Sequence, residues 1–182
     1  VSYSIDPGTA TAGSDYTPVS GTLTFAPGET AKQVSVPVSG DNVYEPDEVF
    51  RLSLYGATNA YHADGTTTFA ATIVNNDPLP TITAARYTAG ETGAESGALG
   101  FRFALSNPSA LWVQVNYATA DGTATSGSDY VGKADTLYFA PGETQKDVFV
   151  QLLTDTADEP DETFTFNLSN PAGGSLGTTA VT

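Results

Sequence analysis

The feature that most constrains this chain is an internal repeat. Three motifs each return 114 residues later in the sequence. They are Gly-Thr-Ala-Thr-x-Gly-Ser-Asp-Tyr at 8–16, Phe-Ala-Pro-Gly-Glu-Thr at 25–30 and Glu-Pro-Asp-Glu at 45–48. Because all three keep the same separation, the chain holds two copies of one structural module.

The length of the repeat predicts where each module begins and ends. A period of 114 residues suits a β-sandwich of about 100 residues, so 182 residues cannot hold two full copies. We therefore predict module 1 at residues 1–78, without its first strands, and module 2 at residues 79–182, without its last strand. The polar, proline-containing segment 75–80 would be a short, stiff linker between them.

Alternation of apolar and polar residues predicts strands in both modules. Helical periodicity never extends beyond about two turns, and Pro followed by Gly between the strands suits a type II turn. Short strands about ten residues apart predict an all-β fold of tandem, immunoglobulin-like antiparallel β-sandwiches. The alternating segments are 22–25, 33–38, 49–54, 148–152 and 164–168.

Several apolar side chains are expected to form the cores. Val34, Val36 and Val38 share one face of the predicted strand 33–38, and that face should point inward. Tyr16 and Tyr130 are expected to be packing residues. The single tryptophan, Trp112, is also expected in a core.

Composition excludes several classes of partner. The formal charge of −15, from 21 acidic and 6 basic residues, argues against nucleic acid and anionic lipid and favours cations. Cysteine is absent, which excludes disulfides and thiol chemistry. No run of about 18 apolar residues occurs, so direct membrane insertion is not expected.

The acids gather in one loop of each module. Module 1 has Asp41, Glu45, Asp47 and Glu48, module 2 has five acids within 155–162, and neither cluster contains Lys or Arg. Crowded carboxylates repel one another, and a cation would give a reason to gather them. Ca²⁺ takes about six to eight oxygen ligands and suits such a loop better than Mg²⁺ or Zn²⁺. A solvated acidic turn explains the residues equally well.

The joint order of these motifs resembles the Calx-β domain, a family found in sodium/calcium exchangers, integrin β4 and large bacterial surface proteins. Each motif alone is weakly specific, but the Gly-Ser-Asp-Tyr turn, the Pro-Gly-Glu-Thr turn and the Asp-x-x-x-Glu-x-x-Glu loop follow one another twice. The resemblance covers almost the whole chain. It implies immunoglobulin-like sandwiches that bind Ca²⁺ at their ends.

The resemblance also implies a set of calcium ligands. They come from the Ser-Asp-Tyr motif, the acidic loop with one of its carbonyls, the first strand and the end of the last strand. For module 1 these are Asp15, Asp41, Val43 (carbonyl), Glu45, Glu48 and Asp77. For module 2 they are Glu95, Asp129, Asp155, Ala157 (carbonyl), Glu159 and Glu162. Gly40 and Thr154 replace an aspartate of the family's loop, which implies fewer ions or weaker binding.

Alternatives to ligation stay open for some of these acids. Asp15 and Asp129 could instead form Asx turns that satisfy the local backbone. Asp47 and Asp161, each next to a proline, are expected to be solvated.

Two functional hypotheses follow. In the first, the chain is a Ca²⁺-binding tandem of an extracellular or cell-surface protein, in which ions at the module ends stiffen the array. Its partners would be calcium ions, neighbouring repeats and a cell-surface or matrix ligand. In the second, the modules are metal-free spacers or adhesion modules. The open sheet edges are expected to pair with neighbouring molecules, or else the strands that would cover them belong to a longer natural chain.

Catalysis is not expected. Glu45 and Glu48 could in principle serve as the acid and base of a glycosidase, but they crowd one exposed loop rather than a cleft. The sequence also lacks a Ser-His-Asp set, a Gly-rich phosphate loop and a Cys nucleophile.

Overall fold

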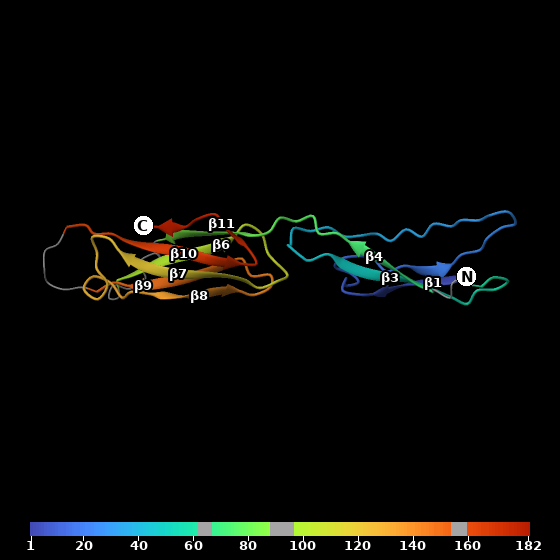
Figure 1. Ribbon diagram of the computed structural model, residues 1–182, viewed down its shortest axis with the longest axis horizontal. Coiled ribbons are helices and arrows are strands. Elements are labelled where there is room, and N and C mark those ends of the chain that lie inside the picture. The colour runs from blue at the N-terminus through green and yellow to red at the C-terminus, as the bar shows by residue number, and fades with distance from the viewer. Residues whose placement is uncertain (62–66, 88–96, 154–159) are drawn as a thin grey trace. The chain divides into compact units, whose positions relative to one another are not determined.

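The computed structural model describes residues 1–61, 67–87, 97–153 and 160–182. The chain divides into two compact units. Unit 1 comprises Val1–Asp41 and Pro46–Asn76, and unit 2 comprises Asn42–Glu45 and Asp77–Thr182. All regular secondary structure in the described ranges is β-strand (Figure 1). Within those ranges, no helix has the length and apolar character needed to cross a membrane.

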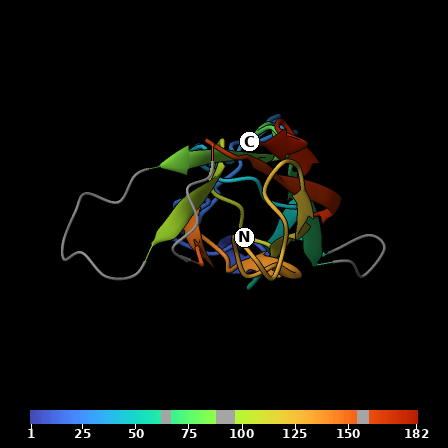
Figure 2. The same cartoon turned by 90° about the vertical axis from the view of Figure 1, so that its left-hand side faces the viewer.

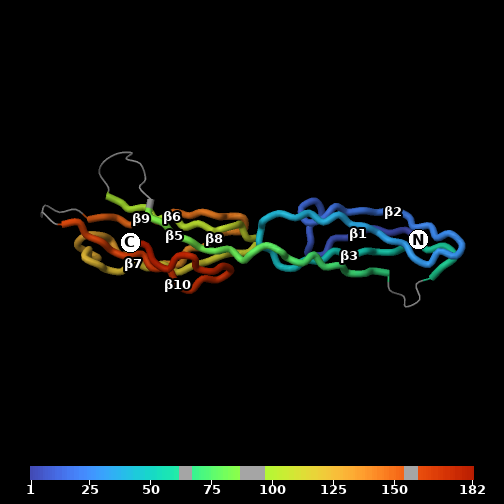
Figure 3. The backbone as a smooth tube through the Cα atoms, turned by 90° about the horizontal axis from the view of Figure 1, so that it is seen from above, coloured from blue at the N-terminus to red at the C-terminus, as the bar shows by residue number. Residues whose placement is uncertain are grey.

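Unit 1 contains one antiparallel sheet in the order β2-β1-β3-β4. Its strands are β1 (Ser2–Pro7), β2 (Ser20–Thr22), β3 (Glu48–Tyr55) and β4 (Thr68–Ile73). Figure 3 shows β1, β2 and β3 running side by side. The buried cluster on this sheet is small and consists of Ile5, Ala10, Tyr16 and Phe50.

Unit 2 contains two sheets, and Figure 2, which looks at it end-on, shows their strands on opposite sides. The first sheet has the order β12-β10-β7-β8 and the second has the order β11-β5-β6-β9. The first is built from β7 (Val113–Asp121), β8 (Ala134–Phe139), β10 (Phe164–Ala172) and β12 (Ala180–Val181). The second is built from β5 (Thr81–Tyr87), β6 (Ala98–Leu105), β9 (Gln145–Gln151) and β11 (Ser175–Leu176).

Aromatic side chains from both sheets fill the core of unit 2. Phe101 of β6 stacks on Phe166 of β10 with ring centroids 4.5 Å apart, and Tyr117 of β7 stacks on the same ring at 5.0 Å. Val113, Val115 and the other inward residues of these strands are also buried. The predicted all-β sandwich class is therefore confirmed, and the predicted burial of Tyr16 and Tyr130 is confirmed as well.

The Gly-Thr-Ala part of the repeat fastens a turn to a neighbouring strand. In unit 2 the N–H of Thr163 donates to Thr123 Oγ1 at 2.8 Å, and the N–H of Ala124 donates to the Thr163 carbonyl at 3.0 Å. A Cβ on Gly122 would collide with that carbonyl, so only glycine fits there. Thr9, Ala10 and Val49 form the same bonds in unit 1.

The Ala-Pro-Gly-Glu segments form the turns that the sequence predicts. The N–H of Glu29 donates to the Ala26 carbonyl at 2.9 Å, and Gly28 has φ of 85°, as the third residue of a type II turn requires. Gly142 has φ of 80° in the equivalent turn of unit 2.

Two predicted strands of unit 1 and the predicted burial of Trp112 differ from the structure. The expected strand 33–38 is a plain trace in Figure 1, with one isolated bridge at Val38. The expected strand 22–25 ends at Thr22, although Leu23 still exchanges backbone bonds with Val1. Trp112 precedes β7 and is 62% exposed rather than buried.

The missing strand has a physical cause. Its counterpart in unit 2 is β9, which pairs with β6 along its length. In the described part of unit 1, no strand pairs with segment 33–38 along its length. Alternation specifies which faces are apolar, but a strand also needs a neighbour to accept and donate hydrogen bonds.

We expect the same substitution, valine to alanine, to destabilise the two units to different extents. Val150 of β9 is fully buried, whereas its counterpart Val36 is half-buried. Val150→Ala should lower the free energy of unfolding of unit 2 by about 2 kcal/mol, because it removes buried methyl groups and leaves a cavity. Val36→Ala should lower that of unit 1 by less than half as much. Denaturant titration followed by hydrogen exchange checks this, and equal losses would contradict it.

Candidate metal centre

A tight turn holds Asp15 in place. The N–H of Thr11 donates to Asp15 Oδ2 at 2.6 Å, and the N–H of Asp15 donates to the Thr11 carbonyl at 3.0 Å. Partial burial raises the pKa of Asp15, but hydrogen bonds from Thr11, Ser14 and Glu48 outweigh it, so the pKa is lowered. These two bonds form the Asx turn that was the alternative to calcium ligation for Asp15. A carboxylate that accepts one backbone bond keeps further lone pairs for an ion.

Three carboxylates meet beside this turn. Asp15, Glu45 and Glu48 are half-buried, and each offers an oxygen that lies within 4.8 Å of the others. Glu48 begins β3, and Glu45 precedes it by three residues, next to Pro46. Oxygens bound to one Ca²⁺ are at most about 5 Å apart, so the spacing fits such an ion. Carboxylates this close cannot all stay ionised without compensation, so either one of them binds a proton or a cation binds between them.

Among the described acids, the group within 4.8 Å does not include Asp41 or Asp77. Asp41 is exposed, while Val43 and Asp77 are half-buried. Asp47 is exposed, as expected, but its Oδ1 accepts a hydrogen bond from the N–H of Asn75 at 2.9 Å. The acidic loop is thereby bonded to the segment that follows β4.

The candidate site of module 2 is only partly described. Asp129 repeats the turn of Asp15, since its Oδ2 accepts from the N–H of Thr125 at 2.7 Å and from Thr125 Oγ1 at 3.0 Å. Glu162 is exposed. The remaining predicted ligands, Glu95, Asp155, Ala157 and Glu159, lie outside the described residues.

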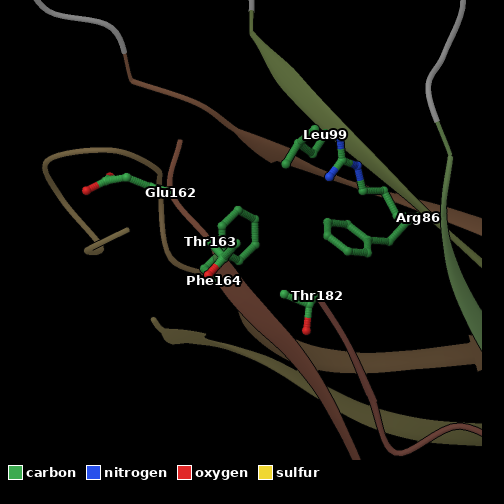
Figure 4. A pocket seen from close by; sticks show the side chains of 7 residues that line it. Arg86, Leu99, Glu162, Thr163, Phe164 and Thr182 are labelled. Atoms are coloured by element: carbon green, nitrogen blue, oxygen red, sulfur yellow. The ribbon is translucent and has the colours of Figure 1, made fainter. Parts of the chain in front are cut away.

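A small cavity of about 50 Å³ lies beside Glu162 in unit 2. Figure 4 shows Arg86, Leu99 and Thr182 around it, with the Glu162 carboxylate turned away. Ligand pockets usually measure about 300 Å³ or more, so this cavity can hold water but no small-molecule substrate.

Sequence reasoning missed a carboxylate that supports the turn of module 2. Tyr130 donates its hydroxyl to Asp121 Oδ1 at 2.6 Å, and the N–H of Ser126 donates to the same oxygen at 2.9 Å. The bond from Tyr130, followed by that from Ser126, lowers the pKa of Asp121. In module 1 the counterpart of Asp121 is Pro7, and the buried hydroxyl of Tyr16 has no hydrogen-bond partner among the described residues. The sequence does contain a sign of this difference, because Asp121-Gly122 in the second repeat corresponds to Pro7-Gly8 in the first.

The comparison with family models identifies the chain. A model of the Calx-beta domain matches residues 1–78 and 94–181. The chain belongs to the Calx-beta domain family. The resemblance inferred from the motifs is thus confirmed.

Curated relatives of this Calx-beta chain include sodium/calcium exchangers. Sodium/calcium exchanger 2 of Rattus norvegicus is 28% identical over 186 residues, which cover 94% of this chain and 20% of the exchanger. The exchanger Calx of Drosophila melanogaster is 27% identical over 171 residues, covering 94% of this chain and 18% of the relative. The chain therefore spans about a fifth of the length of these relatives.

The solved structures that match the chain include crystal structures of Calx CBD domains. A crystal structure of CBD12 from CALX1.2 is 24% identical and covers 94% of this chain and 66% of that chain, with a TM-score of 0.44. The apo form of the Calx CBD1 domain is 29% identical, covers 47% of this chain and 82% of that chain, and has a TM-score of 0.41.

The relatives correct one expectation. An extracellular or cell-surface location is wrong, because curated relatives that match 94% of the chain are sodium/calcium exchangers. The motifs are shared by both groups, so the sequence features that identified the family could not separate them.

The two tyrosines offer a matched test of the local network in this Calx-beta chain. Tyr130→Phe should lower the free energy of unfolding of unit 2 by about 1 kcal/mol, because Asp121 loses a hydrogen bond. Tyr16→Phe should leave that of unit 1 unchanged or slightly higher, since its hydroxyl is unpaired. Denaturant unfolding, with Trp112 fluorescence for unit 2 and hydrogen exchange for unit 1, measures both.

The effect of Tyr130→Phe should also depend on pH. Because the folded state lowers the pKa of Asp121, its stabilisation is present above the unfolded-state pKa and is lost as the pH falls through the folded-state pKa. The difference between wild type and Tyr130→Phe should therefore shrink in acid. A difference that stays constant down to low pH would show that the Asp121 bond is not its source.

Proposed function

We propose that the chain is a regulatory, calcium-binding tandem whose first site is built around Asp15, Glu45 and Glu48. The observation that carries this proposal is the meeting of three half-buried carboxylates within 4.8 Å of one another. No Lys or Arg occurs between positions 41 and 48 to neutralise them. Calx-beta domains are regulatory calcium-binding domains rather than enzymes, which supports the same conclusion.

The chemistry of the donors favours Ca²⁺. All three side chains offer carboxylate oxygens, the hard ligands that Ca²⁺ prefers, and the loop supplies no His or Cys for Zn²⁺. A loop site with irregular spacing also suits Ca²⁺ better than the strict octahedron of Mg²⁺. We further propose that Asp41, Asp77 and the carbonyl of Val43 complete the first site with water.

For the second site we propose the corresponding residues of module 2. Asp129 occupies the same turn as Asp15, and Glu162 corresponds to Glu48 in the repeat. Glu95, Asp155, Glu159 and the Ala157 carbonyl complete the proposed set. The substitution of Thr154 for an acidic residue should make this site weaker than a fully acidic one.

An ion at the first site would also act on the linker. Asp47 lies between Glu45 and Glu48 and accepts a hydrogen bond from Asn75, at the start of segment 75–80. Ordering the acidic loop around Ca²⁺ would therefore order the residues that lead to the next module. We propose that calcium stiffens the junction between neighbouring repeats and that this is how a larger protein senses the ion.

Calorimetry tests the site directly. Wild type should bind Ca²⁺, and saturation at 100 times the dissociation constant should raise the free energy of unfolding by about 2.7 kcal/mol. The double variant Glu45→Gln/Glu48→Gln should lose binding at module 1, because two of the three gathered carboxylates become neutral amides. Glu29→Gln removes a carboxylate in a separate turn, where it pairs with Lys32, and should leave binding unchanged.

Two outcomes would overturn the calcium proposal. One is the absence of both heat and thermal stabilisation at millimolar Ca²⁺, which would leave the metal-free spacer. The other is equal loss of binding in the double variant and in Glu29→Gln, which would show that only overall charge matters.

The stiffening of the junction has its own test. In ¹⁵N relaxation measurements, Ca²⁺ should slow the independent tumbling of the two modules in wild type. Asp47→Ala removes the bond to Asn75 and leaves the three gathered carboxylates intact. It should keep calcium binding at module 1 but lose at least half of the change in tumbling. If Asp47→Ala stiffens as much as wild type does, the linker is not coupled through this bond.

A further inference from the structure

The turns that carry Asp15 and Asp129 have the same backbone hydrogen bonds. In module 2 the N–H of Gly127 donates to the Tyr130 carbonyl at 2.9 Å, and the N–H of Asp129 donates to the Thr125 carbonyl at 3.0 Å. The same two bonds occur 114 residues earlier in module 1, again at 2.9 and 3.0 Å. A difference between the two turns must therefore come from the side chains around them.

Side chains bond the turn of module 2 to the end of β7. Asp121 is the last residue of β7, and its Oδ1 accepts hydrogen bonds from the hydroxyl of Tyr130 at 2.6 Å and from the N–H of Ser126 at 2.9 Å. Ser126 Oγ in turn accepts from the N–H of Gly132 at 3.1 Å. One carboxylate therefore fixes both the turn and the tyrosine that ends it, and the serine bonds the turn to the residues that follow.

Module 1 keeps the tyrosine but has none of these partners for it. The residues that correspond to the aspartate, the serine and the glycine are Pro7, Ala12 and Pro18. The first two have no side-chain acceptor, and proline has no N–H to donate. The buried hydroxyl of Tyr16 therefore has no hydrogen-bond partner among the described residues.

The fold itself does not need the additional bonds. Tyr16 is as deeply buried as Tyr130, and each ring stacks on a phenylalanine, Phe50 at 4.9 Å and Phe164 at 4.2 Å. Packing and backbone hydrogen bonds are thus sufficient to form the turn in module 1. In module 2 the side-chain bonds restrict the motion of a turn that would form without them.

We propose that Asp121 is a positioning residue for calcium binding in module 2, and that Pro7 leaves the Asp15 turn as the adjustable part of the first site. The inference rests on the proposed calcium function, because Asp15 and Asp129 are the ligands that the two turns would supply. A turn that is already fixed in its binding conformation loses less conformational entropy when an ion binds. Module 1 has to order its turn as the ion binds, and this lowers the affinity of its site.

Hydrogen exchange on the calcium-free protein tests the difference in rigidity. Protection factors of the amides at 125–130 should exceed those at 11–16 by about fivefold. Pro7→Asn supplies an uncharged acceptor for the Tyr16 hydroxyl and should raise the protection at 11–16. The control Pro7→Asn/Tyr16→Phe has the same residue at position 7 but no hydroxyl to donate, so it should show less than half of this gain.

Calcium titration tests the consequence for binding, with the amide resonances of Asp15 and Asp129 reporting on the two modules separately. Pro7→Asn should tighten binding at module 1 by about threefold, while the control double variant should bind much as wild type does. Because asparagine is neutral, the gain cannot come from added charge. Tyr130→Phe removes the corresponding bond from module 2 and should weaken binding there by about the same factor.

The outcomes separate this inference from the proposed function. Equal protection of the two turns without calcium would overturn the inference, and so would equal calcium affinity of Pro7→Asn and its control. In both cases calcium binding by wild type would still support the proposed function. A wild-type protein that binds no calcium would overturn the inference and the proposed function together.

Discussion

The candidate site depends on the hydrogen bonds that fasten the Gly-Thr-Ala turn to the start of β3. Val49 donates its N–H to Thr9 Oγ1 and accepts from the N–H of Ala10 through its carbonyl. These bonds bring the turn that carries Asp15 beside Glu48, although the two acids are far apart in sequence. Asp15 lies far from Glu45 and Glu48 in the sequence, and this contact between a turn and a strand brings the three acids together. Unit 2 has the same contact, between Thr123 and Thr163.

The electrostatics of the group follow from this geometry. Asp15 already accepts a backbone hydrogen bond, which favours its ionised form and lowers its pKa. The neighbouring carboxylates then meet a fixed negative charge, and in a half-buried place solvent screens it only in part. A divalent cation relieves this repulsion without protonating any member. The same hydrogen bond that makes Asp15 a turn-capping residue also makes it a preorganised anion, so the two interpretations of that residue are compatible.

Local pattern predicted what depends on local physics. Alternation located β3, β9 and β10, and Pro-Gly placed the two type II turns, because side-chain period and φ preference act within a few residues. Alternation wrongly predicted a strand at 33–38, because a strand also needs a pairing partner. The expected burial of Trp112 was wrong as well, since this residue lies just before β7 rather than within it. The acids of each loop were visible in sequence, but their approach to Asp15 depends on a contact between distant segments. The module limits and the wider ligand sets stay predictions.

The two modules also differ in what their acids do, and this limits any argument from charge alone. In module 2, Asp121 accepts from Tyr130, Asp147 pairs with Arg102 and Glu143 pairs with Lys146. Module 1 has Pro7 and Gln33 in place of the first two. A net charge of −15 therefore overstates the number of carboxylates that a cation could use, because some already serve hydroxyl or cationic partners. What points to a metal site is a group of acids that the fold brings within 4.8 Å of one another, so position in the fold matters more than the number of acids.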